Sequence, residues 1–232
     1  MNRAQTDALA LEFRLLRNKI EAKLEAPAVI LVTSATVDDG TALTALSIAE
    51  SFSASNQRTV LVTSDQSAHL IATAAYPGGA EMRRRKMDKF GAANRSSADE
   101  QLSVVRVSPE NMATISRSSV AALLQRLRDE YAYIIVDGPN LPQNPLALLL
   151  ASAASGILVA FASGRLPLPA DAAMLEILDG SSATMLGVVM SDRATIDHFA
   201  QRSASDIPSA AEPAMRPIDH RDVALRQAGE SF

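Results

Sequence analysis

Three short segments of the chain carry side chains whose types and spacing could bind a nucleotide or a metal ion. Each segment follows a run of apolar residues, and the candidates are Ser34, Asp38, Asp39, Gly40, Thr41, Ala42, Asp65 and Asp137. A glycine-bearing loop between a strand and a helix can direct backbone N–H groups at phosphate oxygens, and carboxylates at strand ends can hold magnesium. Because ligands of open α/β sheets bind at the carboxyl ends of the strands, we expect these side chains to meet at one edge of the sheet.

The elements that must position these side chains can be predicted from the apolar runs. Their hydrophobicity is continuous rather than alternating, which indicates strands covered by helices on both faces. The predicted strands are residues 29–32, 60–62, 102–107, 133–136, 156–161 and 185–190. Helical segments separate several of them, so the sequence predicts an α/β fold with a doubly wound, mostly parallel sheet and helices on both faces.

The same patterns divide the chain into three parts. Residues 1–27 are predicted to form an amphipathic helix closed by Pro27, and residues 28–192 the α/β domain. Residues 193–232 lose the apolar period and fill with Ser, Ala, Pro and charged residues, so a disordered tail is predicted there.

Composition narrows the classes of function and the compartment. With 22 Lys and Arg against 26 Asp and Glu the net charge is -4, so the chain has no general electrostatic attraction for nucleic acid. We therefore expect no nucleic-acid partner. The absence of cysteine excludes disulfides and thiolate metal sites. The N-terminus lacks the apolar core of a signal peptide, and the uncharged stretch Leu141 to Gly164 contains Pro142, Pro145 and Gly156, which favour a helix running into a buried strand over a membrane span. We therefore expect a cytoplasmic protein without direct membrane insertion.

The sequence resembles the bacterial tyrosine kinases of polysaccharide synthesis (BY-kinases), a branch of the MinD/ParA-like P-loop proteins. The segments that carry the resemblance are VILVTSATVDDGTALTALSIAESF, RTVLVTSDQ and YAYIIVDGP, which are similar in order to the family's phosphate loop, Walker A′ strand and Walker B strand. LQRLRDEYAYIIVDGP is the most specific match, and the similarity extends from about residue 12 to residue 190. The resemblance implies a P-loop fold and, in an active member, Mg-ATP as cofactor.

The chain departs from the family pattern where the chemistry would take place. The family's phosphate loop has the general form S-A-x-P-G-E-G-K-[ST]-[ST], with which Ser34 and Gly40 agree. Asp38 stands in place of the first glycine and Asp39 in place of the glutamate. Thr41 stands in place of the lysine, and Ala42 replaces the hydroxyl that binds magnesium.

The acidic strand ends and the tyrosines differ from the family as well. In the D-x-D of the Walker A′ strand Thr63 replaces the first aspartate, which leaves Asp65, whereas Asp137 matches the Walker B position fully. The family autophosphorylates a tyrosine cluster in its C-terminal tail, and this chain has no tyrosine there.

These departures weaken the expected site for Mg-ATP. A charge about 4 Å from another is worth roughly 4 kcal/mol at an effective dielectric near 20, so replacing the lysine and adding Asp38 both oppose a triphosphate. We expect weak or absent ATP binding, no cofactor, no catalytic residue and no metal. Asp137 is the one candidate metal ligand, and its other interpretation is a strand-end carboxylate that caps the following turn.

The first helix and one basic run are the candidate partner surfaces. EFRLLRNKI resembles the family's N-terminal helix with its E-x-x-R-x-x-R oligomerisation motif, although Leu11 occupies the first acidic position. Phe13, Arg14 and Arg17 are the best candidates for partner contacts, and packing of this helix on the sheet is the alternative. The run from Arg83 to Lys86 is either a solvated surface or a site for an acidic partner.

Together these observations predict a non-catalytic scaffold or regulator in bacterial exopolysaccharide or capsule biosynthesis. The resemblance implies that its partner is a membrane polysaccharide co-polymerase or a catalytic paralogue, which would recruit it to the inner membrane, and association with a second copy stays open. The first alternative is an active ATP-dependent tyrosine kinase, and the second is a MinD/ParA-like positioning ATPase. Both alternatives require the lysine that Thr41 replaces.

Overall fold

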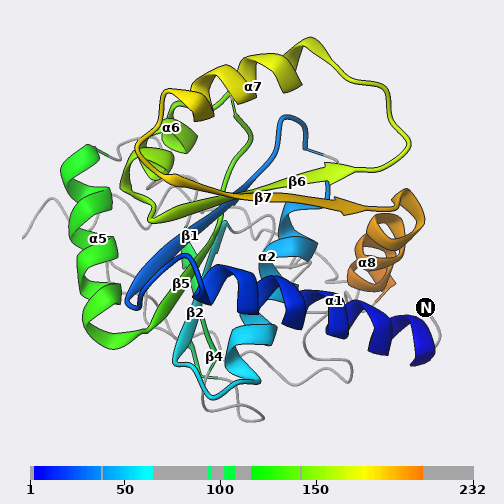
Figure 1. Cartoon of the computed structure of the whole chain (residues 1–232), viewed down its shortest axis with the longest axis horizontal. Coiled ribbons are helices and arrows are strands. Elements are labelled where there is room, and N and C mark those ends of the chain that lie inside the picture. Colours follow the sequence, from blue (N-terminus) through cyan, green and yellow to red (C-terminus); the bar gives the residue numbers. More distant parts are fainter. Residues whose placement is uncertain are drawn as a thin grey trace, which may run out of the picture.

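The computed structural model describes residues 3–37, 39–64, 94–95, 102–107, 116–141 and 143–205 of the chain. These residues form one sheet with helices packed on it (Figure 1). The strands are β1 (Ala28–Thr33), β2 (Thr59–Ser64), β3 (Asn94–Arg95), β4 (Leu102–Val107), β5 (Tyr133–Asp137), β6 (Gly156–Ala162) and β7 (Thr184–Ser191). The helices are α1 (Arg3–Glu21), α2 (Thr41–Ser53), α5 (Arg117–Glu130), α6 (Pro145–Ala153), α7 (Pro169–Asp179) and α8 (Arg193–Ser205).

The sheet has the order β3-β4-β2-β5-β1-β6-β7. All neighbouring strands are parallel except the two-residue β3, which pairs antiparallel with β4 at one edge. The predicted α/β fold is confirmed, and each predicted strand lies in the sheet. The stretch that the sequence interpreted as a helix running into a buried strand is α6 followed by β6.

Two hydrophobic cores lie on opposite faces of the sheet. On one face α1 and α2 pack on the sheet around the stacked rings of Phe52 and Tyr133, whose centroids are 4.0 Å apart. On the other face α5, α6 and α7 contribute residues such as Leu124, Ala147 and Met174. Because both faces are covered, β1 and β5 are buried along their whole length, which explains their continuous apolar sequence.

The register of the central strands brings three sequence segments to one edge of the sheet. β5 lies between β1 and β2, with Val29 and Val60 both aligned to Ile134. Val32 is aligned to Asp137, so β1, β2 and β5 end at nearly the same height. The loop after β1, the end of β2 and the turn after β5 therefore meet at the carboxyl edge, as the sequence predicted.

Helix α8 corrects the prediction of a disordered tail from residue 193. That prediction is wrong for residues 193–205, which form a helix, whereas residues 206–232 lie outside the described part. The Asp192 carboxylate precedes the helix and accepts the Thr195 backbone N–H at 2.9 Å, as an N-cap does. Phe199 packs against the core on the α1 and α2 face, so this mostly polar helix contacts the rest of the protein through an apolar side chain.

None of the helices in the described ranges is long and apolar enough to cross a membrane.

Candidate functional site

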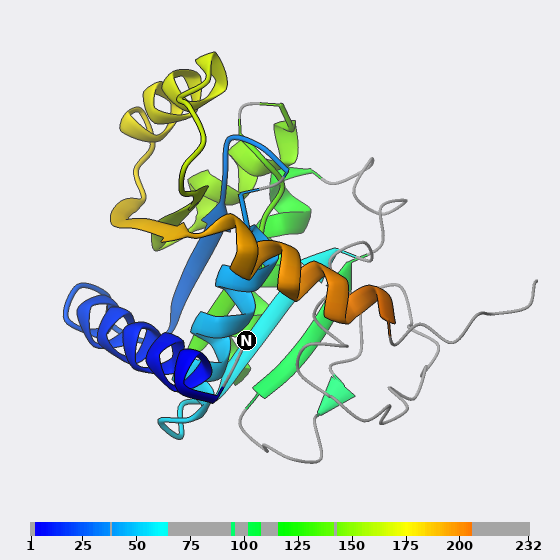
Figure 2. The ribbon, with the colours of Figure 1, turned by 90° about the vertical axis from the view of Figure 1, so that its right-hand side faces the viewer.

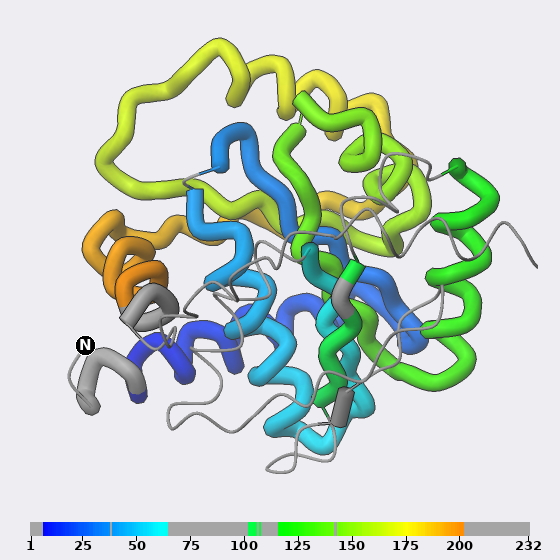
Figure 3. The backbone as a smooth tube through the Cα atoms, turned by 180° about the vertical axis from the view of Figure 1, so that it is seen from behind, coloured from blue at the N-terminus to red at the C-terminus, as the bar shows by residue number. Residues whose placement is uncertain are grey.

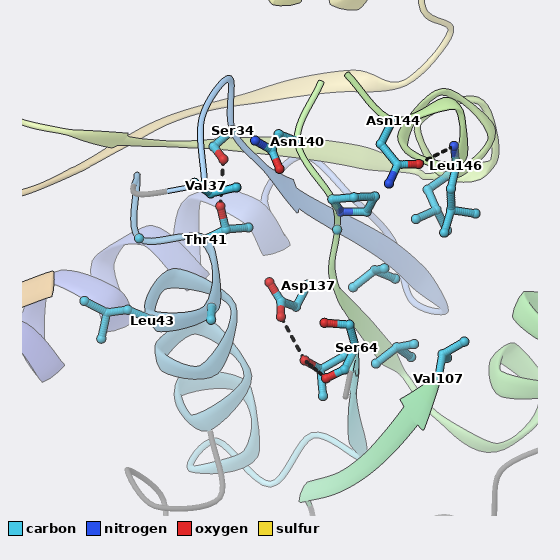
Figure 4. A pocket seen from close by; sticks show the side chains of 18 of the residues that line it. Ser34, Val37, Thr41, Leu43, Ser64, Val107, Asp137, Asn140, Asn144 and Leu146 are labelled. Atoms are coloured by element: carbon cyan, nitrogen blue, oxygen red, sulfur yellow. Dashed lines mark hydrogen bonds between the residues drawn. The ribbon is translucent and has the colours of Figure 1, made fainter. Parts of the chain in front are cut away.

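The loop of residues 34–42, called here the 34–42 loop, joins β1 to α2 at the carboxyl edge. Gly40 is the N-cap of α2 and has φ 81°, a left-handed conformation that glycine adopts without strain. Thr41 Oγ1 donates to Ser34 Oγ at 2.9 Å (Figure 4). Ser34 Oγ in turn donates to the Thr36 carbonyl at 2.7 Å. The two hydroxyls therefore hold the loop together by hydrogen bonds within it.

Asp39 is buried and points into the protein. Its side chain is fully buried, and Oδ1 accepts the Ala162 backbone N–H at 3.1 Å, while Oδ2 accepts the Thr36 hydroxyl at 2.8 Å. Arg165 completes the shell with two hydrogen bonds, Nε to Oδ1 at 2.7 Å and Nη2 to Oδ2 at 3.0 Å. Asp39 therefore ties the 34–42 loop to the end of β6 and does not line the pocket described below.

The electrostatics keep Asp39 ionised. Burial opposes its charge, but the hydrogen bonds from Arg165, Ala162 and Thr36 outweigh that effect and hold the pKa of this carboxyl below its usual value. The same arrangement raises the pKa of Arg165, first through its hydrogen bonds to Asp171 and then through those to Asp39.

Arg165 bridges two carboxylates. Besides Asp39 it contacts Asp171, with Nη1–Oδ2 at 2.7 Å and Nη2–Oδ1 at 2.6 Å, and its guanidinium carbon lies 3.9 Å from the centre of the Phe161 ring. The Asp171 carboxylate also accepts the Leu168 backbone N–H at 2.6 Å at the start of α7. This cluster, called here the Arg165 bridge (Asp39, Arg165 and Asp171), joins the 34–42 loop, the end of β6 and α7.

Sequence reasoning missed Arg165 and Asp171. Asp39 and Arg165 are 126 positions apart, and no local spacing connects them. A partial signal exists at α7, where Pro169 at the first helical position and Asp171 two residues later are typical of a helix N-terminus. That signal predicts the helix start but not the ion pair with Asp39.

Asp137 lies at the end of β5, only 9% exposed, and accepts a hydrogen bond from Thr63 at the end of β2. The distance from Thr63 Oγ1 to Asp137 Oδ2 is 2.8 Å. Thr63, which stands at the first aspartate of the D-x-D pattern that the sequence resembles, thus donates to the Asp137 carboxylate of the neighbouring strand. A second carboxylate at Thr63 would repel Asp137 unless a cation lay between them, whereas a hydroxyl satisfies it directly.

The turn after Asp137 is fixed to the end of β1. Gly138 N–H donates to the Val32 carbonyl at 2.9 Å, and Thr33 Oγ1 donates to the Pro139 carbonyl at 2.8 Å. A Cβ on Gly138 would overlap the end of the buried Leu31 side chain and lie 3.1 Å from the Val32 carbonyl oxygen, so a larger residue here would force the Leu31 side chain to shift. These contacts set the position of Asp137 relative to the 34–42 loop.

A pocket of about 580 Å³ opens at this edge. The 34–42 loop and α8 line one side and α5 and α6 the other, and Figure 3 shows α8 and the start of α2 side by side with α5 across the strands from them. Most of the lining is apolar, for example Leu123 and Leu146. Among the described residues that line it, the charged ones are Asp137, Arg193 and Asp197, of which the last two form an ion pair at 3.4 Å.

Helix α8 fills space next to the 34–42 loop. It leaves the end of β7 and runs past the first turns of α2 (Figure 2). Ile196 approaches Gly40 so closely that a Cβ added to that glycine would lie 3.1 Å from the Ile196 side chain. An apolar side chain thus lies beside the segment whose backbone would have to receive phosphate in a P-loop protein.

The residues present do not fit a magnesium–triphosphate group. Position 41 supplies a hydroxyl already bonded to Ser34 in place of an ammonium, and position 42 supplies a methyl group in place of a metal ligand. Asp137, the one candidate metal ligand, lies at the pocket, whereas the candidate positions Asp38 and Asp65 lie outside the described residues.

The three predicted partner contacts on the first helix have different surroundings in the structure. Phe13 is 6% exposed and packs in the core between α1 and α2, so its prediction as a partner contact is wrong. Arg17 is held within the chain, because Nη1 donates to the Ser51 carbonyl of α2 at 2.9 Å. Arg14 lies on the exposed face of α1. The basic run from Arg83 to Lys86 lies outside the described residues.

Comparison with known proteins yields likeness of structure only. No known family profile matches the chain, and no curated protein sequence matches it. Among solved structures, the kinase domain of the Escherichia coli tyrosine kinase ETK superposes with a TM-score of 0.54 at 16% identity, over 71% of this chain and 67% of that one.

Two further structures extend the likeness. The VpsO kinase domain has a TM-score of 0.60 at 16% identity, over 82% of this chain and 99% of that one. A cobyrinic acid a,c-diamide synthase from Mycobacterium smegmatis, bound to an ATP analogue and magnesium, has a TM-score of 0.55 at 14% identity, over 77% of this chain and 82% of that one. This chain therefore has the α/β fold of the P-loop ATPase-like domains.

Proposed function

We propose that the chain is a non-catalytic relative of the bacterial tyrosine kinases. It would act as a scaffold or regulator in exopolysaccharide or capsule biosynthesis, by protein–protein interaction with a membrane polysaccharide co-polymerase or a catalytic paralogue. The sequence resemblance and the likeness of fold to tyrosine kinase domains support the family part of this proposal.

The observation that supports the non-catalytic part is that polar side chains at the carboxyl edge form hydrogen bonds with other side chains of the protein. Asp39 is bonded to Arg165, Thr41 to Ser34, and Thr63 to Asp137, so each of these groups is already engaged with another side chain. In a working P-loop the corresponding positions face phosphate and magnesium. Here they stabilise the edge of the sheet, which supports a fold retained without phosphoryl transfer.

The surface available for a partner is the outer face of α1. With Phe13 in the core and Arg17 bonded to α2, Arg14 is the remaining predicted contact. Leu11 and Leu15, which are 55% and 54% exposed, flank it on the solvent side. A helix with exposed leucines and a cation can dock on a membrane protein's cytoplasmic segment, which would recruit the chain to the inner membrane.

Complementation in the encoding bacterium tests the proposal. A strain without this chain would receive the wild type or Asp137→Asn, which keeps the shape of the side chain but loses its charge. We expect both to restore polymer production equally, because a scaffold does not need the acidic group of the Walker B position. Loss of polymer with a folded, normally abundant Asp137→Asn protein would favour the active kinase and contradict the proposal.

The partner surface is tested in the same strain with Arg14→Glu. We expect this charge reversal to lower both polymer production and recovery of the chain in the membrane fraction. Arg126→Glu, at an exposed position of α5, is the matched control and should leave both unchanged. Equal results for the two variants would show that α1 is not the docking face.

A further inference from the structure

Strand β7 forms one end of the described sheet, where β6 is its neighbour (Figure 1). Its sequence, TMLGVVMS, contains no charged residue and is typical of a strand that is buried on both faces. The structure nevertheless leaves it exposed, because Val188 is 56% and Met190 64% accessible, whereas β1 and β5 are buried throughout. An apolar strand at the edge of a sheet is a template for pairing with another strand.

The two ends of the described sheet differ in how they are protected against such pairing. At the other end, β3 consists of two residues, Asn94 and Arg95, and both short length and charge discourage pairing. β7 has 8 residues and neither lysine nor proline. Its ladder with β6 is irregular before Gly187 and regular from there to Ser191, so this second half of β7 is the part suited to pairing.

The backbone groups of Val188 and Met190 point away from β6. The Ser191 carbonyl accepts the N–H of Ser163, directly after β6, at 2.8 Å, so the backbone groups of Ser191 point toward β6. Successive residues of a strand direct their N–H and C=O groups to opposite edges, so those of Met190 and Val188 face outward. The side chains of the same two residues lie together on the α7 face, because Val188 is aligned with the core residue Val159.

We propose that β7 pairs with β7 of a second copy of the chain, antiparallel and about a two-fold axis, so that the two sheets join into one. In the register centred on Val189, Val188 lies opposite Met190 of the second copy. The N–H of each donates to the C=O of the other, and their exposed side chains meet on one face. The same contact is repeated on the other side of the axis, as an interface between identical subunits requires.

A second copy suits this strand better than a charged partner segment. β7 offers no charge for such a segment to pair with, whereas an identical strand matches its outward backbone groups and its apolar side chains. The apolar surface also continues onto α7, because the exposed Leu175 lines the same hollow as Met185 at the start of β7. The inference goes beyond the proposed function and does not depend on it.

The contact is large enough for a weak, specific dimer. The 8 residues of β7 span about 26 Å, at roughly 3.3 Å per residue. The sheet and one layer of helices beside it add a depth of about 20 Å, since a helix is about 10 Å thick. A contact of these dimensions buries roughly 500 Å² on each copy, and the total lies at the lower limit of about 1,000 Å² for a specific interface.

Sedimentation equilibrium of the full chain over a range of concentrations measures the association. We expect a concentration-dependent dimer with twice the mass of one chain. Val188→Lys should raise its dissociation constant at least about tenfold, because the two-fold axis places each added cation opposite an apolar side chain twice. Leu148→Lys, the same change at an exposed position of α6, is the matched control and should dimerise like the wild type.

Val188→Pro is a second disrupting variant. The proline removes an N–H that points away from β6, so the ladder within the chain keeps its hydrogen bonds while the pairing between copies loses some of its own. The variant should therefore keep the circular dichroism spectrum of the wild type and lose the dimer.

Amide hydrogen exchange locates the contact without a substitution. The N–H groups of Val188 and Met190 point away from β6, so their protection should rise with the concentration of the chain. The Val189 N–H is directed at β6 and should be protected at every concentration.

Cross-linking tests the register. The chain has no cysteine, so Val189→Cys can form a disulfide only between copies. Opposed residues at the axis have Cα atoms about 4.5 Å apart in a pair without mutual hydrogen bonds, which is within the reach of a disulfide. Mild oxidation should give a covalent dimer with Val189→Cys and none with Leu148→Cys.

A monomer at every concentration overturns the inference, and so does a dimer that folded Val188→Lys and Val188→Pro leave unchanged. A monomer in which the Val188 and Met190 amides are protected would show that another part of the same chain covers β7, which also overturns it. A dimer in which these amides stay unprotected, or in which Leu148→Cys cross-links as readily as Val189→Cys, would place the contact elsewhere and contradict the proposed pairing.

Discussion

Replacing Arg165 with methionine should destabilise the fold by leaving a buried carboxylate without its cation. The Asp39 side chain is fully buried, and Arg165 supplies two of its hydrogen bonds, at 2.7 and 3.0 Å. Removing one partner of a buried ion pair costs about 3–5 kcal/mol of unfolding free energy. At about 2–4 °C per kcal/mol for a chain of this size, the expected fall in Tm is roughly 10 °C.

The pH dependence of this loss gives a second check. In the wild type the pKa of Asp39 is lowered, so its charge stabilises the fold above the unfolded pKa of about 3.9, and the stabilisation is lost as the pH falls through the folded value. In Arg165→Met the carboxyl stays buried without the cation, so we expect its pKa to rise and its ionisation to oppose folding. The difference from the wild type should therefore be largest near pH 7 and shrink toward about pH 4.

Urea unfolding of wild type, Arg165→Met, Asp39→Asn and the double variant at both pH values measures these quantities. The double-mutant cycle should show a coupling free energy of about 0.5–3 kcal/mol between the two positions. Arg126→Met removes an exposed arginine from α5 and should change stability by less than about 0.5 kcal/mol. If Arg165→Met behaves like Arg126→Met at both pH values, the Arg165 bridge does not stabilise the 34–42 loop.

Three further substitutions test the packing around the site, each by thermal or urea unfolding. Thr63→Val removes the hydroxyl that donates to the buried carboxylate at the end of β5 and should cost about 1–3 kcal/mol; an unchanged midpoint would contradict this hydrogen bond. Gly138→Ala should cost about 1–3 kcal/mol through overlap with β1, whereas Gly180→Ala, whose added methyl group meets nothing closer than 3.7 Å, should not; equal Tm values would refute the close approach. Phe13→Ala should lower the free energy of unfolding by about 3–5 kcal/mol, whereas Leu15→Ala, at an exposed position, should change it by less than about 0.5 kcal/mol. A larger loss for Leu15→Ala than for Phe13→Ala would contradict the burial of Phe13.

The sheet could be predicted from the sequence because its strands are buried on both faces. Runs such as residues 29–32 and 133–136 are uninterrupted by charge, and their polar ends fall where the chain leaves the sheet. The meeting of Thr63 and Asp137 follows from that topology, since β2 and β5 are parallel neighbours. What the sequence could not supply is the hydrogen bond itself, which depends on the rotamers of two buried side chains.

The Arg165 bridge and α8 were beyond prediction for different reasons. Asp39 belongs to a loop that resembles a phosphate loop, so the sequence places its side chain near a phosphate. Its partner in the structure, Arg165, is 126 positions away, so only the folded structure reveals that the Asp39 side chain points into the protein. Helix α8 is mostly polar, and the side chains that seat it, Ile196 and Phe199, form too short an apolar pattern to predict a helix. For Phe13 the amphipathic pattern allowed both packing and partner contact, and burial decides between them.

Isothermal titration of the full chain with Mg-ATP tests the central claim most directly. A chain with Thr41 and Ala42 in the 34–42 loop, and with Asp39 bonded to Arg165, should give no saturable heat and no transfer of radiolabelled phosphate to protein tyrosine. Micromolar affinity, together with phosphate transfer that Asp137→Asn abolishes, would contradict the account and establish an active kinase.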